Sequence, residues 1–359
     1  MIEFPAFRAT RMCGVLSEGP TWDAARERLL WVDIQAGLVH EGVLECDGSI
    51  TAVQRFEFSG TVGAVAVSTA EALAVAAADT VLIIDPEGDR REFSRILPPR
   101  SGRRINDAST DPAGRLYLGT LSLEQPSESE VLVRIEDDGE VTVIDDDLTL
   151  SNGIAWSPSG DRMYSVDSLR RTIYVREYDP ATGRTGRREV FIDGLTGIPD
   201  GICADRDGGL WVAVWGAGQV RRYDRDGGQD AVIDVPVPHV SSVGFAGTDL
   251  GTLVITTAQQ DLTAAELQRF PASGALFTAS VDVPGVPIAP WRGSIYQEGN
   301  ECDSSASATR GTSAPPHSSP TARTSTSPTS RPISMRRSSG RAVSRRSAGS
   351  SPNAMRADI

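Results

Sequence analysis

The chain has 359 residues with an ordinary globular composition up to about Gly293, and its 48 acidic and 35 basic residues give a formal net charge of −13. That length suits one large all-β domain rather than two unrelated ones. The sequence has no apolar run of the roughly 20 residues that span a bilayer, no signal-peptide pattern at its start and no Cys-x-x-Cys pair, so we expect a cytoplasmic protein without a membrane segment or a redox pair.

A short polar signature recurs along the chain, each time ten to twelve residues before an apolar pair that is typical of a β-strand. In chain order the signatures are Ser17–Pro20, Asn106–Asp107, Ser151–Gly153 and Pro199–Gly201, and the apolar pairs are Leu30–Trp31, Leu116–Tyr117, Met163–Tyr164 and Leu210–Trp211. Weaker copies around Leu73 and Leu253 fill the gaps, so that successive pairs are 43 to 47 residues apart. This regular spacing indicates six copies of one structural unit.

Within a copy, short runs of strand-forming residues alternate with Asp-Gly and Ser-Gly turns that suit hairpins. A period of this length with several strands per copy is the signature of a β-propeller, so we predict an all-β fold, a six-bladed β-propeller with four-stranded blades. The alternative, a doubly wound α/β fold, needs helical periodicity between strands, and there is little beyond Ala264–Leu267. The tryptophans are then expected to pack between blades; they are Trp22, Trp31, Trp156, Trp211 and Trp215.

The composition changes after Gly293. Residues 294–359 are rich in Ser, Thr, Pro, Ala and Arg and carry nine arginines against four acidic residues, so their net charge is about +5 and that of residues 1–293 is about −18. We assign 1–293 to the propeller and 294–359 to a disordered tail, because the tail has too little apolar surface to offset its ordering entropy. A frameshifted reading of GC-rich DNA would give the same composition and stays an alternative. Nucleic-acid binding is not expected, since the tail lacks interleaved aromatic residues.

Residues at one phase of a closed ring converge on its axis, and this brings together Glu18, Asn152 and Asp200. Two carboxylates and an amide supply hard oxygen ligands with a total charge of −2, a set that suits Ca²⁺, Mg²⁺ or Mn²⁺, with Zn²⁺ left open. We therefore predict a central metal site with one divalent cation. The alternative for each residue alone is an ordinary turn position, because Asn-Gly, Asp-Gly and Glu-Gly-Pro are common turn sequences.

Other catalytic chemistries lack their motifs. The chain has three histidines and no Gly-x-Ser-x-Gly elbow, His-Glu-x-x-His pair, Gly-x-Gly-x-x-Gly turn or Walker loop. His239, near Ser241, is expected to be an exposed loop residue, the alternative being a position that lines the pocket. What remains is a cation that polarises a carbonyl while a carboxylate takes a proton from water, which is the chemistry of ester hydrolysis.

Several dispersed segments resemble the gluconolactonase, regucalcin and luciferin-regenerating-enzyme family of six-bladed propellers. These segments occur in the family's order and spacing, and the resemblance runs from about Met12 to Gly293; they are Leu16–Trp22, Arg104–Asp107, Asp111–Arg115, Ser151–Trp156, Val166–Ser168, Ile198–Gly201 and Leu210–Ala213. The loop Leu121–Glu130 does not match the family's lid, and substrate choice is expected to lie there. The tail has no counterpart in the family, so the pairing that closes the ring is left open.

The resemblance implies a role for each residue of the site. Glu18, Asn152 and Asp200 would bind the divalent metal, and Asp200 would also be the general base that activates water. Arg104 and Asn106 would contact the hydroxyls and carbonyl of a sugar lactone, because a guanidinium donates several fixed hydrogen bonds to oxygen-rich ligands. The alternative for Arg104 is a surface charge beside Arg103.

The sequence thus predicts a metal-dependent lactonase that hydrolyses a small-molecule sugar lactone as a monomer or small homo-oligomer. Two alternatives stay open. One is a hydrolase of another ester or of a phosphotriester, since an open metal site with a carboxylate base also suits phosphoryl centres. The other is a non-catalytic propeller that binds Ca²⁺.

Overall fold

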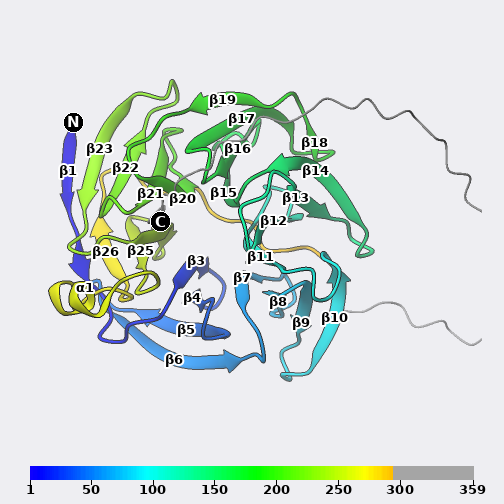
Figure 1. The fold of residues 1–359 in the computed structure, drawn as a ribbon, viewed down its shortest axis with the longest axis horizontal. Coiled ribbons are helices and arrows are strands. Elements are labelled where there is room, and N and C mark those ends of the chain that lie inside the picture. The colour runs from blue at the N-terminus through cyan, green and yellow to red at the C-terminus, as the bar shows by residue number, and fades with distance from the viewer. Residues whose placement is uncertain (294–359) are drawn as a thin grey trace, which may run out of the picture. The chain divides into compact units, whose positions relative to one another are not determined.

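The computed structural model describes residues 1–293, which form six small sheets arranged in a ring, each sheet one blade of a six-bladed β-propeller (Figure 1). The predicted fold is confirmed. The strands of each blade are given from the innermost outward. Blade 1 is β3 (Ser17–Asp23), β4 (Arg28–Asp33), β5 (Leu38–Leu44) and β6 (Ile50–Glu57); blade 2 is β7 (Val62–Val67), β8 (Leu73–Ala77), β9 (Thr80–Ile84) and β10 (Arg90–Arg95). Blade 3 is β11 (Arg103–Thr110), β12 (Leu116–Ser122), β13 (Glu130–Ile135) and β14 (Val141–Leu148). Blade 4 is β15 (Ser151–Trp156), β16 (Arg162–Asp167), β17 (Thr172–Asp179) and β18 (Arg184–Thr185), with β19 (Glu189–Ile192) also on β17; blade 5 is β20 (Ile198–Ala204), β21 (Leu210–Trp215), β22 (Gln219–Tyr223) and β23 (Gln229–Asp234); blade 6 is β24 (Val240–Ala246), β25 (Thr252–Thr257) and β26 (Phe277–Ser280).

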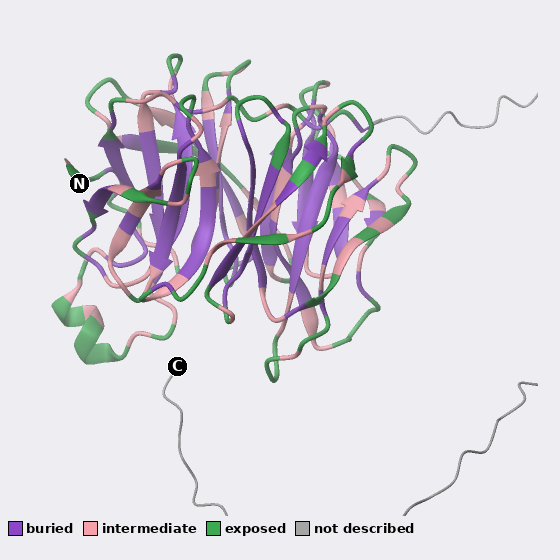
Figure 2. Cartoon of the chain, turned by 90° about the horizontal axis from the view of Figure 1, so that it is seen from above, coloured by how far each residue is buried: buried purple, intermediate pink, exposed green. Residues whose placement is uncertain are grey.

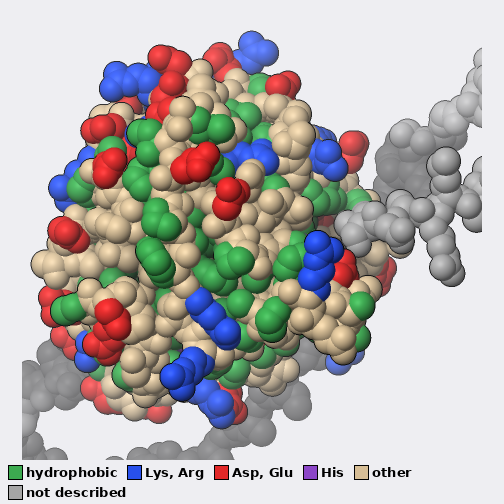
Figure 3. Space-filling model, turned by 90° about the vertical axis from the view of Figure 1, so that its left-hand side faces the viewer, with side chains coloured by type: hydrophobic (Ala, Val, Ile, Leu, Met, Phe, Trp, Pro, Cys, Tyr) green, Lys and Arg blue, Asp and Glu red, His purple; other side chains and the backbone are tan. Residues whose placement is uncertain are grey.

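The N-terminal strands close the ring. β2 (Phe7–Arg8) pairs with β26 and completes blade 6, while β1 (Ile2–Pro5) pairs in parallel with β23 as a fifth strand of blade 5. The side of the molecule that carries β1 shows small groups of hydrophobic side chains among charged ones (Figure 3). The last two blades therefore take their outermost strands from the beginning of the chain, and no residue beyond Gly293 is needed for this pairing.

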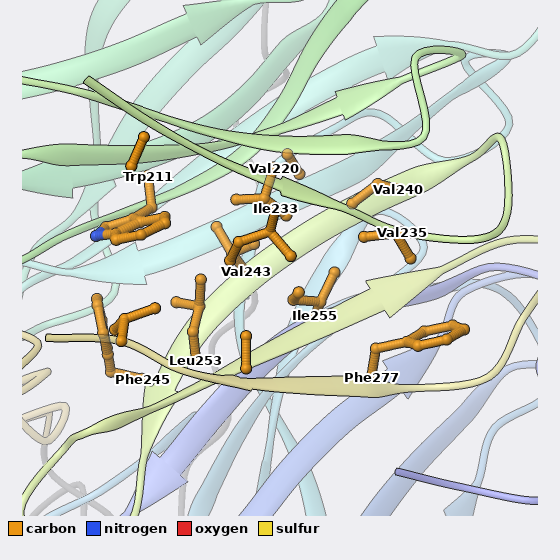
Figure 4. Close-up of a cluster of buried hydrophobic side chains, with 14 of the residues drawn as sticks. Trp211, Val220, Ile233, Val235, Val240, Val243, Phe245, Leu253, Ile255 and Phe277 are labelled. Carbon is orange, nitrogen blue, oxygen red and sulfur yellow. The ribbon is translucent and has the colours of Figure 1, made fainter. Parts of the chain in front are cut away.

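Neighbouring blades are held together by buried apolar clusters. Between blades 5 and 6, Trp211 and Ile233 face Phe245, Leu253 and Phe277 (Figure 4). Trp31 packs against blade 6 in the same way, and Trp156 lies between the Tyr117 and Tyr178 rings. Since burying one such side chain is worth roughly 1.5–3 kcal/mol, these clusters are the main source of cohesion between blades. The expected role of these three tryptophans is confirmed.

The innermost strands share a local irregularity. In each of β3, β7, β11, β15, β20 and β24, the register with the second strand of the blade shifts near the start of the strand. Such bulges bend a strand and redirect a side chain. The shift begins directly after Glu18 and Asn152 in blades 1 and 4 and includes Asn106 and Asp200 in blades 3 and 5. In blades 2 and 6 it includes Gly63 and Ser241. The two blades with weak copies of the sequence signature thus place no charged group at this level.

The segment 281–293 follows β26 and crosses the ring (Figure 1), on the face at which the innermost strands end. Its backbone is hydrogen-bonded to blade 5 through Val286 N and Ala204 O (3.1 Å) and to blade 2 through Trp291 N and Val67 O (2.7 Å). Trp291 is buried against Phe93 with ring centroids 5.1 Å apart. We call residues 281–293 the strap. The predicted tail, 294–359, lies outside the described residues.

Within residues 1–293 the helical content is α1 (Ala264–Arg269), which projects from one face of the ring (Figure 2). It follows the end of β25, which pairs with the start of β24, so it lies on the side where the innermost strands begin. Thr263 caps it, since its side chain accepts from Glu266 N while the Glu266 carboxylate accepts from Thr263 N. This part of the chain contains no helix long and apolar enough to span a membrane.

Candidate metal centre

The structure brings the five predicted site residues together at the start of the innermost strands. Glu18 lies on β3, Arg104 and Asn106 on β11, Asn152 on β15 and Asp200 on β20, and all five are buried. Figure 1 shows these strands converging on the centre of the ring. The alternative of isolated turn positions is therefore wrong for Glu18, Asn152 and Asp200, because each lies inside a strand at a bulge.

Glycines that follow two of these residues allow the innermost strands to approach one another closely. A Cβ atom on Gly153 would lie 2.5 Å from the carbonyl oxygen of Asp200, and one on Gly201 would lie 2.0 Å from Ser242 Oγ. Neither glycine has a positive φ, so the requirement is space rather than backbone conformation. This explains why Asn-Gly and Asp-Gly occur here although no turn is formed.

Asn152 links two blades. Its Nδ2 donates to Asp200 Oδ1 and, at 3.1 Å, to Ser168 Oγ, which in turn donates to Pro199 O at 2.8 Å. Ser168 follows β16 and is almost fully buried. It therefore positions Asn152, a role that the sequence prediction missed, although Val166–Ser168 was among the matching segments.

Arg104 and Asn106 are oriented by hydrogen bonds on β11 of blade 3, beside the blade that carries Asn152. Arg104 Nη1 donates to Asn106 Oδ1 (2.8 Å) and to Ile105 O (3.1 Å), while Asn106 Nδ2 donates to Ser151 O (3.1 Å). Arg104 Nε is buried and has no hydrogen-bond partner among residues 1–293. The surface-charge alternative is wrong for Arg104, which is only 4% exposed and has a donor left for a ligand.

The charges of the centre do not balance. Burial and then repulsion from Asp200 and Asp107 hold the pKa of Glu18 well above its usual range. Burial, and after it repulsion from the Asp107 carboxylate, also raises the pKa of Asp200 well above its usual range. Burial raises the pKa of Asp107 to about 6. The nearby cation is Arg104, whose own pKa is lowered by burial to about 10. Three buried carboxylates therefore face one guanidinium, and the ionised cluster lacks about two positive charges.

A divalent cation fits this charge deficit. Glu18 and Asp200 offer carboxylate oxygens and Asn152 an amide oxygen, which are ligands that Ca²⁺, Mg²⁺ and Mn²⁺ prefer. In the described part of the chain there is no group of three His, Cys, Asp or Glu side chains placed to hold a metal ion. The set found here has only two such residues and depends on the amide for its third ligand.

Asp107 belongs to the same charge cluster, and the sequence prediction gave it no role. Its side chain is buried and accepts a hydrogen bond from Ala108 N at 2.7 Å. It lines a cavity of about 620 Å³ on the strap side of the centre, whose wall also includes Gly19, Ser242 and Pro287–Pro290 of the strap. Glu18, Asn152 and Asp200 do not line this cavity, which therefore lies behind the metal centre.

The loop after β12 is anchored at its far end. The buried Glu130 carboxylate accepts from Arg103 Nε (3.0 Å), Thr120 Oγ1 (2.7 Å) and Ser127 Oγ (2.8 Å). Glu128 reaches Arg170 of blade 4 at 3.7 Å. Control of substrate choice by this loop stays a prediction.

Most of the chain is similar in sequence to known proteins. The family model described as SMP-30/Gluconolactonase/LRE-like region matches residues 16–259. A pentonolactonase of Haloferax volcanii is 36% identical over 299 residues, covering 76% of this chain and 93% of the relative. A 6-deoxy-6-sulfogluconolactonase of Pseudomonas putida is 32% identical over 279 residues (77% and 94%), and a regucalcin of Bos taurus is 30% identical over 291 residues (78% and 95%).

Solved structures show the same fold. A calcium-binding protein, regucalcin, from Agrobacterium tumefaciens is 28% identical and superposes with a TM-score of 0.76 over 81% of this chain and 99% of its own. A luciferin-regenerating enzyme is 22% identical with a TM-score of 0.72 over 80% and 98%, and at that identity it is evidence for the fold alone. The relatives of this chain thus include enzymes named for lactone hydrolysis and a protein named for calcium binding.

Proposed function

Because the chain belongs to the SMP-30/gluconolactonase/LRE-like family, we propose that it is a metal-dependent lactonase that opens a sugar lactone to the corresponding acid. The observation that carries the proposal is the group of buried, mutually repelling carboxylates beside Arg104, with an unpaired Arg104 Nε. Such a group is costly to bury unless a cation binds it. The lactonase names of the relatives indicate the reaction class.

Glu18, Asn152 and Asp200 would hold the cation, which supplies a Lewis acid to polarise the lactone carbonyl. Asp200 accepts a proton from water as the water oxygen bonds to the carbonyl carbon. The bond between that carbon and the ring oxygen then breaks, and the ring oxygen takes up the proton as a hydroxyl. Asn152 keeps the Asp200 carboxylate in place through its Nδ2 hydrogen bond. With the cation bound, the Asp200 carboxylate is held in its ionised form, in which it can accept the proton.

Arg104 and Asn106 orient the substrate. Arg104 Nε is the free donor, and the hydrogen bonds of Nη1 to Asn106 and to the Ile105 carbonyl fix the plane of the guanidinium. A fixed fork of donors suits the carbonyl and hydroxyl oxygens of a lactone. The substrate would thus lie between blade 3 on one side and the Glu18 and Asp200 carboxylates on the other.

The test is acid release from a panel of sugar lactones by chelator-treated protein, with Ca²⁺, Mg²⁺, Mn²⁺ or Zn²⁺ restored singly and Asp200→Ala as control. Turnover that returns with metal and is absent from the variant would support the proposal. A phosphotriester panel runs in parallel, because the same site suits a phosphoryl centre. Metal binding without turnover in either panel would favour a calcium-binding propeller, the class that the name of the Agrobacterium tumefaciens structure indicates.

A further inference from the structure

A stacked tryptophan–histidine pair lies at the rim of the ring on the side of the metal centre. The Trp215 and His239 rings are 4.1 Å apart with an interplanar angle of 13°, and both residues are half-buried. The chain has a second stack of this kind, Trp31 on His40 (5.0 Å, 17°), but that pair is buried. The edges of the Trp215 and His239 rings are therefore partly accessible, whereas those of Trp31 and His40 are buried. His239 is half-buried, so the prediction of an exposed loop residue is wrong.

The rim pair is close to the centre along two strands. Trp215 is the register partner of Ile198, two residues before Asp200, and it packs against the cluster that contains Leu16, two residues before Glu18. At about 3.3 Å per strand residue, the backbone of Ile198, beside Trp215, lies roughly 7 Å from that of Asp200 along β20. That is about the width of one sugar ring. Blades 5 and 6 carry the pair, and blade 6 lies across the ring from blade 3, which carries Arg104.

The pair offers one free hydrogen-bond acceptor and one free donor. His239 Nδ1 is 2.9 Å from Gln260 O, and because a carbonyl only accepts, Nδ1 carries the hydrogen and Nε2 is left as an acceptor. Burial lowers the pKa of His239 although Gln260, Asp261 and Glu266 act in the other direction, so the ring is neutral at pH 7. Neither His239 Nε2 nor Trp215 Nε1 has a hydrogen-bond partner within the part of the chain that the structure describes.

We propose that Trp215 and His239 are specificity-determining residues that bind the ring hydroxyls of the substrate farthest from its carbonyl, Nε2 of His239 accepting and Nε1 of Trp215 donating. This inference rests on the proposed function and narrows it, because such a rim selects polyhydroxylated cyclic lactones over unsubstituted ones. A site built to hydrogen-bond hydroxyls discriminates against an analogue that lacks them, since its polar atoms would then be left unpaired.

The experiment measures binding of gluconolactam, which has the ring and hydroxyls of a sugar lactone but an amide that resists hydrolysis, by calorimetry with metal restored. His239→Phe and Trp215→Phe keep an aromatic ring and each remove one polar atom. We expect each variant to raise the Kd about three- to ten-fold, the effect of losing one neutral hydrogen bond. Binding of δ-valerolactam, which has no hydroxyls, should not change, and His40→Phe in the buried stack should bind both lactams as wild type does.

Unchanged gluconolactam binding in both Phe variants would overturn the inference, and so would an equal loss for the two lactams, which would mean that the pair only packs. Failure of the wild type to bind gluconolactam would also overturn it. If His239→Phe melts early, His239→Gln, which restores an acceptor, should recover affinity, and failure to recover would count against the role. With lactones, KM should rise by the same factor and kcat should stay within about two-fold. Because lactam binding needs no turnover, absence of lactonase activity with intact lactam binding would refute the proposed function alone.

Discussion

Replacing Asp107 by asparagine should stabilise the metal-free protein at neutral pH. Burial raises the pKa of Asp107 from 3.8 to about 6, a difference that corresponds to about 3 kcal/mol at 1.36 kcal/mol per pKa unit. Because the folded pKa is the higher one, the carboxyl contributes most to stability below about pH 4, and this contribution is lost as the pH rises through 6. Asparagine has no charge to bury, and its Oδ1 can still accept from Ala108 N.

The assay is urea denaturation of chelator-treated wild type and Asp107→Asn at pH 4 and pH 7.5, with the exposed Asp282→Asn as a control for loss of a carboxylate. The free energy of unfolding of Asp107→Asn should exceed that of wild type by up to about 3 kcal/mol at pH 7.5 and by little at pH 4. Saturating Ca²⁺ should reduce the gap, because a nearby cation favours the ionised carboxylate. A gap that is the same at both pH values would refute the argument that burial of a charge is its cause.

Three further predictions concern the site and the strap. Asp200→Asn should retain the fold, because an amide oxygen still accepts from Asn152, but turnover with saturating metal should fall by a factor of about 10² or more, the size of a general-base contribution; near-wild-type kcat would rule out that role. Arg104→Ala should mainly raise KM, and an unchanged KM would show that the guanidinium does not touch the substrate. Truncation after Gly293 should leave lactonase activity and melting temperature unchanged, whereas truncation after Ser280 removes the buried Trp291 and should lower the melting temperature by several degrees; equal melting temperatures for the two truncations would contradict a structural role of the strap.

The repeat period predicted the ring and the convergence of the candidate metal-binding residues, because the phase of a residue within a repeat fixes its distance from the axis. Glu18, Asn152 and Asp200 share one phase, and the structure places all three at the same bulge of their strands. The bulges themselves were not predictable from the pattern, since Asn-Gly and Asp-Gly are equally common in turns. Only the neighbouring strand shows why glycine is needed, as the contact of Gly153 with Asp200 illustrates.

Features that depend on contacts between distant segments were missed. The pairing of β2 with β26 involves residues at opposite ends of the folded part, and nothing in the local pattern of Phe7–Arg8 marks its partner. The stack of Trp215 on His239 joins two blades, and the charge interactions of Asp107 with Glu18 and Asp200 join three. Repeat spacing predicts the strand arrangement within each blade, but it does not predict which side chains of different blades contact one another.

Closure of the ring by its N-terminal strands sets the order in which the protein can fold during synthesis. Thr10 Oγ1 accepts from Leu276 N, a partner 266 residues later in the chain. At 5 to 20 residues per second, the ribosome needs on the order of tens of seconds to make that partner. The first residues to leave the ribosome are therefore the last to be paired, and blades 1 to 4 can form while the ring is still open. If the first ten residues detached, the outer edges of β23 in blade 5 and of β26 in blade 6 would both lose their pairing strands.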